Sequence, residues 1–395
     1  MLKNKILLKK KLFKESILAF YLICFLCVPT NLYSQNRPIL KIETGIKSTS
    51  FYDLFEIARY IKLETNSESL VNHIYSVKFR NDTIFGFSRK KVFLWSNSGK
   101  FHRSIGAVGR GSSEMLLPSD FALSPNGKKI GIWDNMLGSL FIYNMEGEFQ
   151  RKVNPGLREI INFDWTNSNQ LIFFSQYIPQ KDKRYSLYLT DSEGKSINSF
   201  LPYDPDDDNF RFLNYSHFPK SGKSQYIWID FDQTIYELKD NSLSPSIRYE
   251  FDKGNLNSKD IVLFKGDTRK LVDYMNNKGY YQLLSFNDMG NYYSFTYSNI
   301  QTISTNIISH DGLKQYRIQH SSESLDPLSG FMPTFIYKDE LVCIVEPYIL
   351  KTKLKQTLPQ MKQRMGAFGL LLDKLSKELK NEDNPVLLFL KPKTL

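Results

Sequence analysis

Three closely spaced glycines are the first residues that suggest chemistry, because a glycine-rich loop can bind a phosphate through its backbone N–H groups. They are Gly106, Gly109 and Gly111. Their spacing, GxxGxG, is neither the dinucleotide fingerprint GxGxxG nor the P-loop, and no helical pattern follows. We therefore interpret them as a turn where the chain crosses between two structural units.

The sequence motifs also give little support for a metal site or for a nucleophilic catalytic residue. The histidines show no metal-binding spacing, and a single cysteine, Cys343, follows the N-terminal 34 residues. The acidic cluster lacks the glycine and distal glutamate of a calcium loop, so we expect a solvated turn there. No Gly-x-Ser-x-Gly elbow marks a nucleophilic serine. The sequence thus predicts no cofactor, no metal site and no catalytic residue. The five histidines are His73, His102, His217, His310 and His320, and the cluster is Asp204, Asp206, Asp207 and Asp208.

The elements around the glycines form a meander. Short apolar runs at 120–123, 129–133 and 139–143 and a charged run ending at Val153 are separated by turns that contain Gly127, Asn135 or Gly147. This alternation of runs and turns predicts four antiparallel strands.

The same unit recurs along the chain. An aromatic-rich run, a turn and a charged run appear in KVFLWSNSGKFHRSI, SLFIYNMEGEFQRKV, SLYLTDSEGKSINSF, TIYELKDNSLSPSIRYEF and TNIISHDGLKQYRI. A sixth apolar run, NPVLLFLKPK, closes the chain. Repeats of about 40 to 50 residues are typical of propellers. The sequence therefore predicts an all-β fold, a six-bladed β-propeller with four antiparallel strands in each blade.

These residues also resemble a known family. The unit from Ile105 onward is similar to an NHL repeat. The whole chain resembles the six-bladed β-propeller proteins of Bacteroides-type bacteria, through IKLETNSESL, DQTIYELKDNSL and DNPVLLFLKPK. The resemblance covers roughly residues 55 to 393 and implies the fold, but it implies little about chemistry.

The N-terminal run is expected to close the ring. The sixth unit offers strands near 332–337, 341–350 and 386–390 but no fourth strand. The run 57–64 alternates like a strand and has no hairpin partner beside it. Because an open edge strand is a liability, we predict that this run completes blade six.

Helical insertions are expected in blades five and six. A short helix capped by Thr268 should run through Asn276 and end before Gly279. In the insertion 351–383, apolar residues recur with a helical period at Met361, Met365, Phe368, Leu372, Leu375 and Leu379. Strand order places this insertion on the channel face, where we expect its helix to pack on the blade tops over one mouth of the channel.

Residues 1–34 have the pattern of a secretory signal peptide, with six lysines, an apolar run at 17–28 and small Ser34 before Gln35. Ile23 and Leu26, the residues before Cys24 and Cys27, are bulky, so we expect release without a lipid anchor. The propeller domain then covers residues 35–395. We expect an exported monomer in the periplasm, outside the cell or at the outer membrane, with no transmembrane segment after cleavage.

Charge is concentrated at one end of the chain. The formal net charge is +11, yet residues 35–350 contain 36 basic and 36 acidic side chains, so the excess lies in the signal segment and in residues 351–395. This distribution disfavours nucleic-acid binding, which needs basic residues along a whole face.

Two function classes fit these observations. We favour a secreted binding or scaffold propeller that recognises a glycan, peptide or partner protein at its channel face. Rigid blades hold the loops in place while the amino-acid sequence of the loops can change, which suits ligand recognition. The alternative is a propeller enzyme, a lyase or a lactonase-like hydrolase, which would need titratable groups with perturbed pKa values converging on one cavity. On the face that carries the insertion, the expected ligand-binding residues are Arg110, Ser112, Glu114, Lys181, Arg184, Asp232, Lys362 and Arg364.

Overall fold

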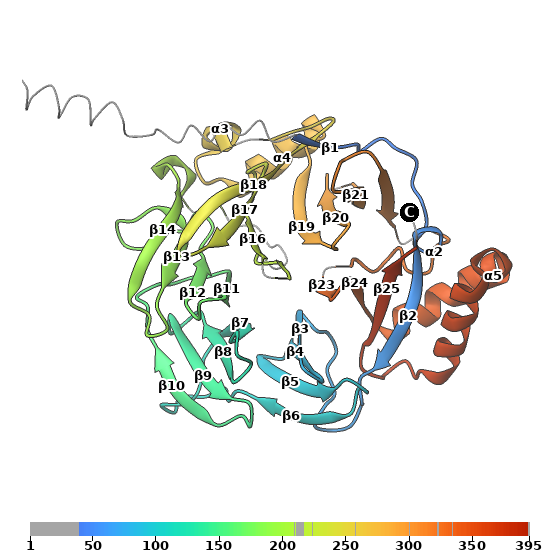
Figure 1. The fold of residues 1–395 in the computed structure, drawn as a ribbon, viewed down its shortest axis with the longest axis horizontal. Helices are drawn as coiled ribbons and strands as arrows, with labels where there is room; N and C mark the ends of the chain where they lie inside the picture. The colour runs from blue at the N-terminus through green and yellow to red at the C-terminus, as the bar shows by residue number, and fades with distance from the viewer. Residues whose placement is uncertain are drawn as a thin grey trace, which may run out of the picture. The chain divides into compact units, whose positions relative to one another are not determined.

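The computed structural model describes residues 39–393, apart from residues 209, 211–216, 223, 257, 300, 322–323 and 334. The predicted signal peptide lies outside these residues. Backbone contacts group Ile39–Leu395 in one unit, in which six sheets surround a central axis (Figure 1). The predicted six-bladed propeller is confirmed.

Each blade is an antiparallel meander that runs from an inner strand to an outer strand. Blade one contains β3 (Ser76–Arg80), β4 (Thr83–Ser88), β5 (Lys91–Ser96) and β6 (Phe101–Ile105). Blade two contains β7 (Pro118–Leu123), β8 (Lys129–Asp134), β9 (Ser139–Asn144) and β10 (Phe149–Val153). Blade three contains β11 (Asn162–Trp165), β12 (Leu171–Phe174), β13 (Tyr185–Thr190) and β14 (Ser196–Pro202).

The other three blades follow the same order. Blade four contains β15 (Lys220–Ser221), β16 (Ser224–Trp228), β17 (Thr234–Lys239), β18 (Ser242–Phe251) and an additional strand, β1 (Ile39–Ile42). Blade five contains β19 (Gln282–Asp288), β20 (Tyr292–Ser298), β21 (Ile303–Ser309) and β22 (Gln315–His320). Blade six contains β23 (Phe335–Tyr337), β24 (Glu340–Val345), β25 (Val386–Pro392) and β2 (Phe55–Lys62).

The N-terminal run closes the ring as predicted. Strand β2 pairs antiparallel with β25 from Phe55 opposite Pro392 to Lys62 opposite Val386, and it is the outer strand of blade six. Its observed bounds begin and end two residues before the predicted run. An N-terminal strand and the last strand of the chain thus share one sheet.

The residues before β2 form a strap across two further blades. Strand β1 pairs parallel with β18 of blade four, which the sequence did not predict. The chain then bridges to blade five, where Arg317 donates to the Ile46 carbonyl and Ser48 pairs with Arg317. It continues through the short helix α2 (Phe51–Leu54) into β2. Residues 39–62 therefore connect blades four, five and six.

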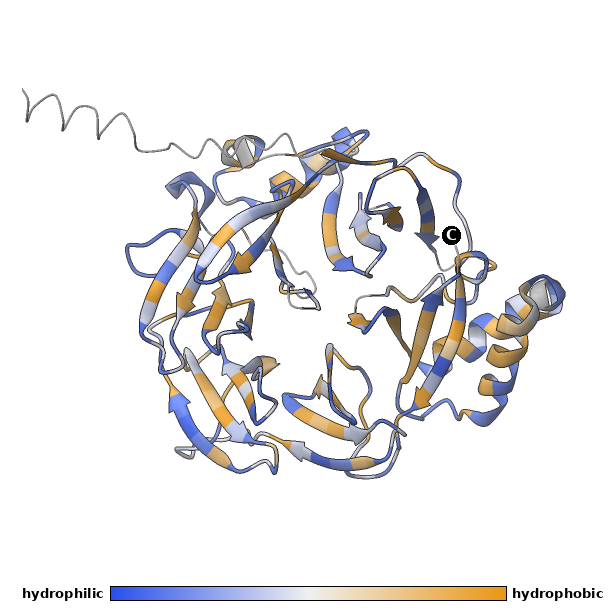
Figure 2. Ribbon diagram, in the orientation of Figure 1, coloured by the Kyte–Doolittle hydropathy of each residue, from blue (hydrophilic) through white to orange (hydrophobic). Residues whose placement is uncertain are grey.

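Apolar side chains fill the spaces between neighbouring blades. Figure 2 shows hydrophobic residues along the inner strands, whereas the outer strand β10 is largely hydrophilic, in agreement with its exposure. Blades two and three meet closely at Gly131, where an added Cβ would lie 2.6 Å from the Trp165 ring. The aromatic side chain occupies the space that glycine leaves, and this fit aligns the two blades.

The connection between blades four and five carries the short helices. It contains α3 (Ser258–Ile261), the 3-10 turn η2 (Val262–Phe264) and α4 (Thr268–Lys278), while another 3-10 turn, η1 (Pro205–Asp207), follows blade three. Helix α4 is capped by Asp267, which accepts from the Lys270 N–H at 3.1 Å, and not by Thr268 as predicted. Gly279 ends the helix with φ 65°, as expected for a left-handed C-cap.

The insertion in blade six is helix α5 (Pro347–Glu378), which is interrupted at Gly366 by a non-helical backbone. All five predicted apolar positions from Met365 to Leu379 are buried. They pack in one cluster with α2, and the rings of Phe368 and Tyr52 lie 6.3 Å apart. In Figure 1, α5 lies beyond the outer strand β2, away from the axis. The expectation that this helix covers a channel mouth is therefore corrected, because α2 and β2 provide an apolar surface at the rim.

Candidate functional site

The residues predicted to bind a ligand lie in separate loops. Glu114, in the crossing from β6 to β7, accepts from the Gly111 N–H at 2.7 Å and so supports its own loop. Arg184 forms an ion pair of 2.8 Å with Asp208, and Asp232 accepts from the Tyr236 hydroxyl at 2.6 Å. Arg110 and Ser112 share the Glu114 crossing, and Lys181 lies in the loop between β12 and β13.

Two further predicted residues, Lys362 and Arg364, belong to α5. The Arg364 guanidinium lies over the Tyr52 ring at 5.7 Å and 4.0 Å from the Asp53 carboxylate, so its described contacts are at the rim. Within the described part of the chain, no hydrogen bond or ion pair joins predicted side chains from different loops. A ligand role for the eight residues stays a prediction.

The acidic cluster is less solvated than predicted. Asp208 pairs with Arg184, and the Asp207 side chain is buried. Burial raises the pKa of Asp207 to about 6, with neighbouring carboxylates adding to the shift. The turn η1 holds these residues against blade three instead of exposing them all to water.

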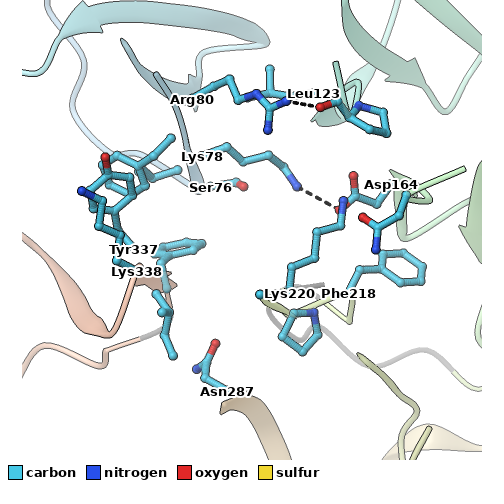
Figure 3. Close-up of a pocket in the computed structure, with 18 of the residues that line it drawn as sticks. Ser76, Lys78, Arg80, Leu123, Asp164, Phe218, Lys220, Asn287, Tyr337 and Lys338 are labelled. Carbon is cyan, nitrogen blue, oxygen red and sulfur yellow. Dashed lines mark hydrogen bonds and ion pairs between the residues drawn. The ribbon is translucent and has the colours of Figure 1, made fainter. Parts of the chain in front are cut away.

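A cavity of about 390 Å³ opens where the inner strands of all six blades meet, and we call it the channel pocket (Figure 3). None of the eight predicted residues lines it. Its wall includes turns that lead from the inner to the second strands, whereas the predicted residues lie in crossings and in loops between second and third strands. From blade one to blade six, its wall includes Lys78, Leu123, Asp164, Lys220, Asn287 and Tyr337.

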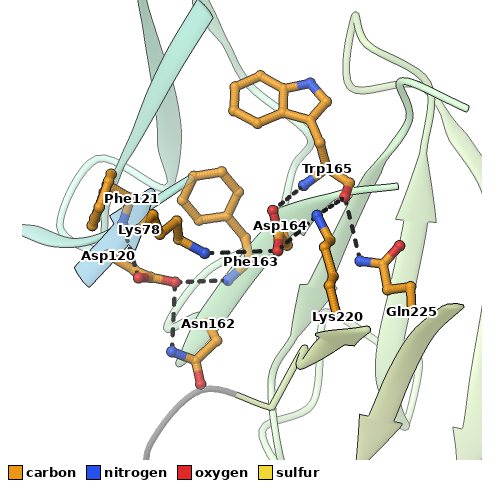
Figure 4. A network of polar contacts seen from close by, with 9 residues as sticks. All are labelled: Lys78, Asp120, Phe121, Asn162, Phe163, Asp164, Trp165, Lys220 and Gln225. Carbon is orange, nitrogen blue, oxygen red and sulfur yellow. Dashed lines mark hydrogen bonds and ion pairs between the residues drawn. The ribbon is translucent and has the colours of Figure 1, made fainter. Parts of the chain in front are cut away.

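Opposite charges converge at one side of the channel pocket. The Asp164 carboxylate on β11 faces two ammonium groups, at 3.1 Å from Lys220 Nζ and 3.7 Å from Lys78 Nζ (Figure 4). Lys220 also donates to the Trp165 carbonyl at 2.9 Å. Because protein atoms displace water around Lys220, its pKa is lowered, although Asp164 opposes this effect. Three blades thus contribute charged groups to one point.

A second carboxylate lies behind this group. Asp120 on β7 is buried and accepts from the backbone N–H groups of Phe121 at 2.8 Å and Phe163 at 3.0 Å. Burial raises the pKa of Asp120 to about 6, while Lys78 and the hydrogen bonds oppose the shift. Since Phe163 belongs to the next blade, Asp120 links the inner strands of blades two and three.

These residues were not predicted from the sequence, although a weak signal for them was present. An aspartate precedes an aromatic residue on two successive inner strands, as Asp120-Phe121 and Asp164-Trp165. In both pairs the carboxylate accepts from the next N–H in the chain, at 2.8 and 2.7 Å. Repetition of this pair on two successive inner strands could have directed attention to these strands.

Comparison with known proteins now identifies the family. The family model described as "Domain of unknown function (DUF4934)" matches residues 38–391. The chain belongs to the DUF4934 family. No curated protein matches the sequence.

Two crystal structures share the fold of this DUF4934 chain. A protein from Bacteroides fragilis described as exported is 17% identical, with a TM-score of 0.70, and the match covers 90% of this chain and 100% of that one. A member of the duf4221 family from Bacteroides vulgatus is 10% identical, with a TM-score of 0.53, covering 86% and 98%. The resemblance to Bacteroides propellers is thus supported at the level of fold, while the likeness to NHL repeats stays a prediction.

The DUF4934 chain also provides one observation on membranes. Among its described helices, none combines the length and the apolar character needed to cross a bilayer.

Proposed function

We propose that this DUF4934 protein is an exported binding propeller that holds part of a glycan, peptide or partner protein in the channel pocket. The observation that carries the proposal is the pocket itself, because every blade contributes to its wall. Its volume of about 390 Å³ lies within the roughly 300–1,000 Å³ of ordinary ligand sites. Export is supported by the signal pattern of residues 1–34 and by the B. fragilis protein of similar fold that is described as exported.

The pocket combines the two features that ligand sites need. Apolar contact area comes from aromatic side chains, among them Tyr337 and Phe335 on β23. Polar groups come from the charged residues on β3, β11 and β15. Because these groups stand on strands of a closed ring, they are held in place before a ligand arrives, which lowers the entropy lost on binding.

A pair of serine variants tests the location of the site. Ser76 lines the pocket, whereas Ser112 is exposed in the crossing where the sequence predicted ligand contacts. The purified protein is first screened on glycan and peptide arrays, and affinities for the recovered ligands are then measured. We expect Ser76→Trp to fill the pocket and weaken binding at least tenfold, while Ser112→Trp binds as the wild type does.

The opposite result, loss of binding in Ser112→Trp alone, would move the site to the other face and reject the proposal. The same ligands also test the alternative of a propeller enzyme, for which the lowered pKa of Lys220, caused by burial of its ammonium group beside Asp164, is the supporting observation. Recovery of the ligand unchanged after long incubation supports a binding protein. A product that no longer forms in Lys220→Met would establish an enzyme.

A further inference from the structure

The charges that line the channel pocket are unbalanced. Its wall contains four cationic side chains but a single anionic one, Asp164. That carboxylate is shared by Lys78 and Lys220. The Arg80 guanidinium donates to the uncharged carbonyl of Pro125, and the Lys338 ammonium lies 5.3 Å from the centre of the Tyr337 ring. Excess positive charge in a cleft with protein walls raises the local concentration of anions.

Several hydrogen-bond donors in the pocket have no partner among the described residues. The Lys220 ammonium has three N–H groups, of which Asp164 and the Trp165 carbonyl take two. Lys78 is 3.7 Å from Asp164, which is beyond hydrogen-bond distance. The pocket therefore offers N–H groups from two lysines to an acceptor that enters between them.

Asn287 adds an independent observation on the opposite side of the pocket. Its side chain is only 6% exposed, and its Nδ2 group has no hydrogen-bond partner among the described residues. In Figure 3 it lies across the pocket from Lys78, at the end of β19. A buried amide without a partner is unfavourable, so an acceptor on a ligand would stabilise it.

These donors fit a carboxylate better than a phosphate. Lysines bind phosphate as well as carboxylate, but the bidentate arginine fork typical of phosphate sites is not offered by this wall, because its arginine already binds the Pro125 carbonyl. The contact of Asp164 with both lysines already places one carboxylate between the two ammonium groups. A second carboxylate can use their remaining N–H groups while an oxygen elsewhere on the ligand accepts from Asn287.

We propose that the channel pocket binds the carboxylate group of an acidic ligand through Lys78 and Lys220, with Asn287 as a further donor. This inference rests on the proposed function and names the chemical class of its ligand. An acidic sugar and the C-terminus of a peptide present the same group, so the test includes both sources.

Matched pairs of ligands test the carboxylate directly. Trigalacturonic acid is compared with its methyl ester, and trialanine with its C-terminal amide, by calorimetry on the purified protein at 50 and 300 mM NaCl. We expect an acid to bind at least tenfold more tightly than its neutral partner, and its affinity to fall at the higher salt concentration. The ligand pair that shows this difference identifies the source of the carboxylate.

Three variants relate binding to the named residues. Lys78→Met and Asn287→Leu should each weaken binding of the acid about tenfold, because each removes a donor to a charged ligand. Asn287→Leu removes a buried amide without a partner, so its melting temperature should not fall and folding does not obscure the result. Lys377→Met serves as the control, since Lys377 lies on α5 and pairs with Asp373 at 3.0 Å.

The possible results distinguish a failure of the carboxylate proposal from a failure of the proposed function. If acids and neutral partners bind equally, if none of the acids binds, or if inorganic phosphate binds more tightly than the acids, the carboxylate class is rejected. The proposed function survives these results when another ligand loses affinity in Ser76→Trp. Binding that persists in Ser76→Trp rejects the proposed function as well.

Discussion

At the scale of single residues, His217 makes the free energy of unfolding depend on pH. Its ring lies between Phe174 and Trp228 at 4.1 Å from each, and Nδ1 donates to the Trp228 carbonyl at 2.8 Å. Burial lowers the pKa of His217 to about 3, whereas in the unfolded chain it is about 6.5. Below pH 6.5 the unfolded state therefore binds more protons, and stability falls as the pH decreases toward 3.

We predict that His217→Phe reduces this acid sensitivity. Between pH 7 and pH 5, His217 should cost the wild type about 2 kcal/mol of unfolding free energy, a loss that phenylalanine cannot cause. Urea unfolding at both pH values measures the difference for each protein. Other titrating groups are common to both proteins and cancel in the comparison. An identical decrease in the two proteins would mean that His217 is protonated in the folded state.

At the scale of elements, the N-terminal strap joins three blades. We predict that a chain starting at Thr49 folds with a lower melting temperature, because it loses β1 with buried Leu40 and Ile42, each worth roughly 1.5–3 kcal/mol. A chain starting at Thr65 also loses α2 and β2 and exposes the edge of β25. This larger loss rivals the ~5–15 kcal/mol total stability of a typical domain, so that chain should not fold.

Circular dichroism and thermal melting compare the two truncations with the full protein. The truncation at Thr49 is the control for β2, because it retains ring closure. A folded chain starting at Thr65 with the wild-type melting temperature would show that β2 is not needed for closure.

At the scale of the whole molecule, the proposed export predicts where the mature chain begins. Cleavage after Ser34 would retain every described residue and leave four residues before β1. The remaining cysteine, Cys343, is buried in β24, and burial raises the pKa of its thiol. Intact mass and N-terminal sequencing of the exported protein should give Gln35 as the first residue. An acylated Cys24 or Cys27 would instead establish a lipid anchor.

The ring of six blades follows from local patterns in the sequence. Alternating apolar residues and regularly spaced turns encode each blade locally, since a strand face and a tight turn depend on near neighbours in the chain. The closure by β2 followed as well, because the sixth unit lacked an outer strand and an unpaired edge is unfavourable. The apolar stripe of α5 was also predictable from the helical period of its residues, and all five positions from Met365 to Leu379 are buried.

The contacts between these elements, in contrast, depend on the assembled fold. Helical periodicity states that α5 has an apolar face but not which surface covers it, and α2 with β2 covers it at the rim. The pairing of β1 with β18 joins segments about 200 residues apart, which no local pattern specifies. The channel pocket also depends on contacts between distant segments, because Lys78, Asp164 and Lys220 stand on three different blades. They meet because closing the ring brings the inner strands to one axis, and that convergence is a property of the assembled blades.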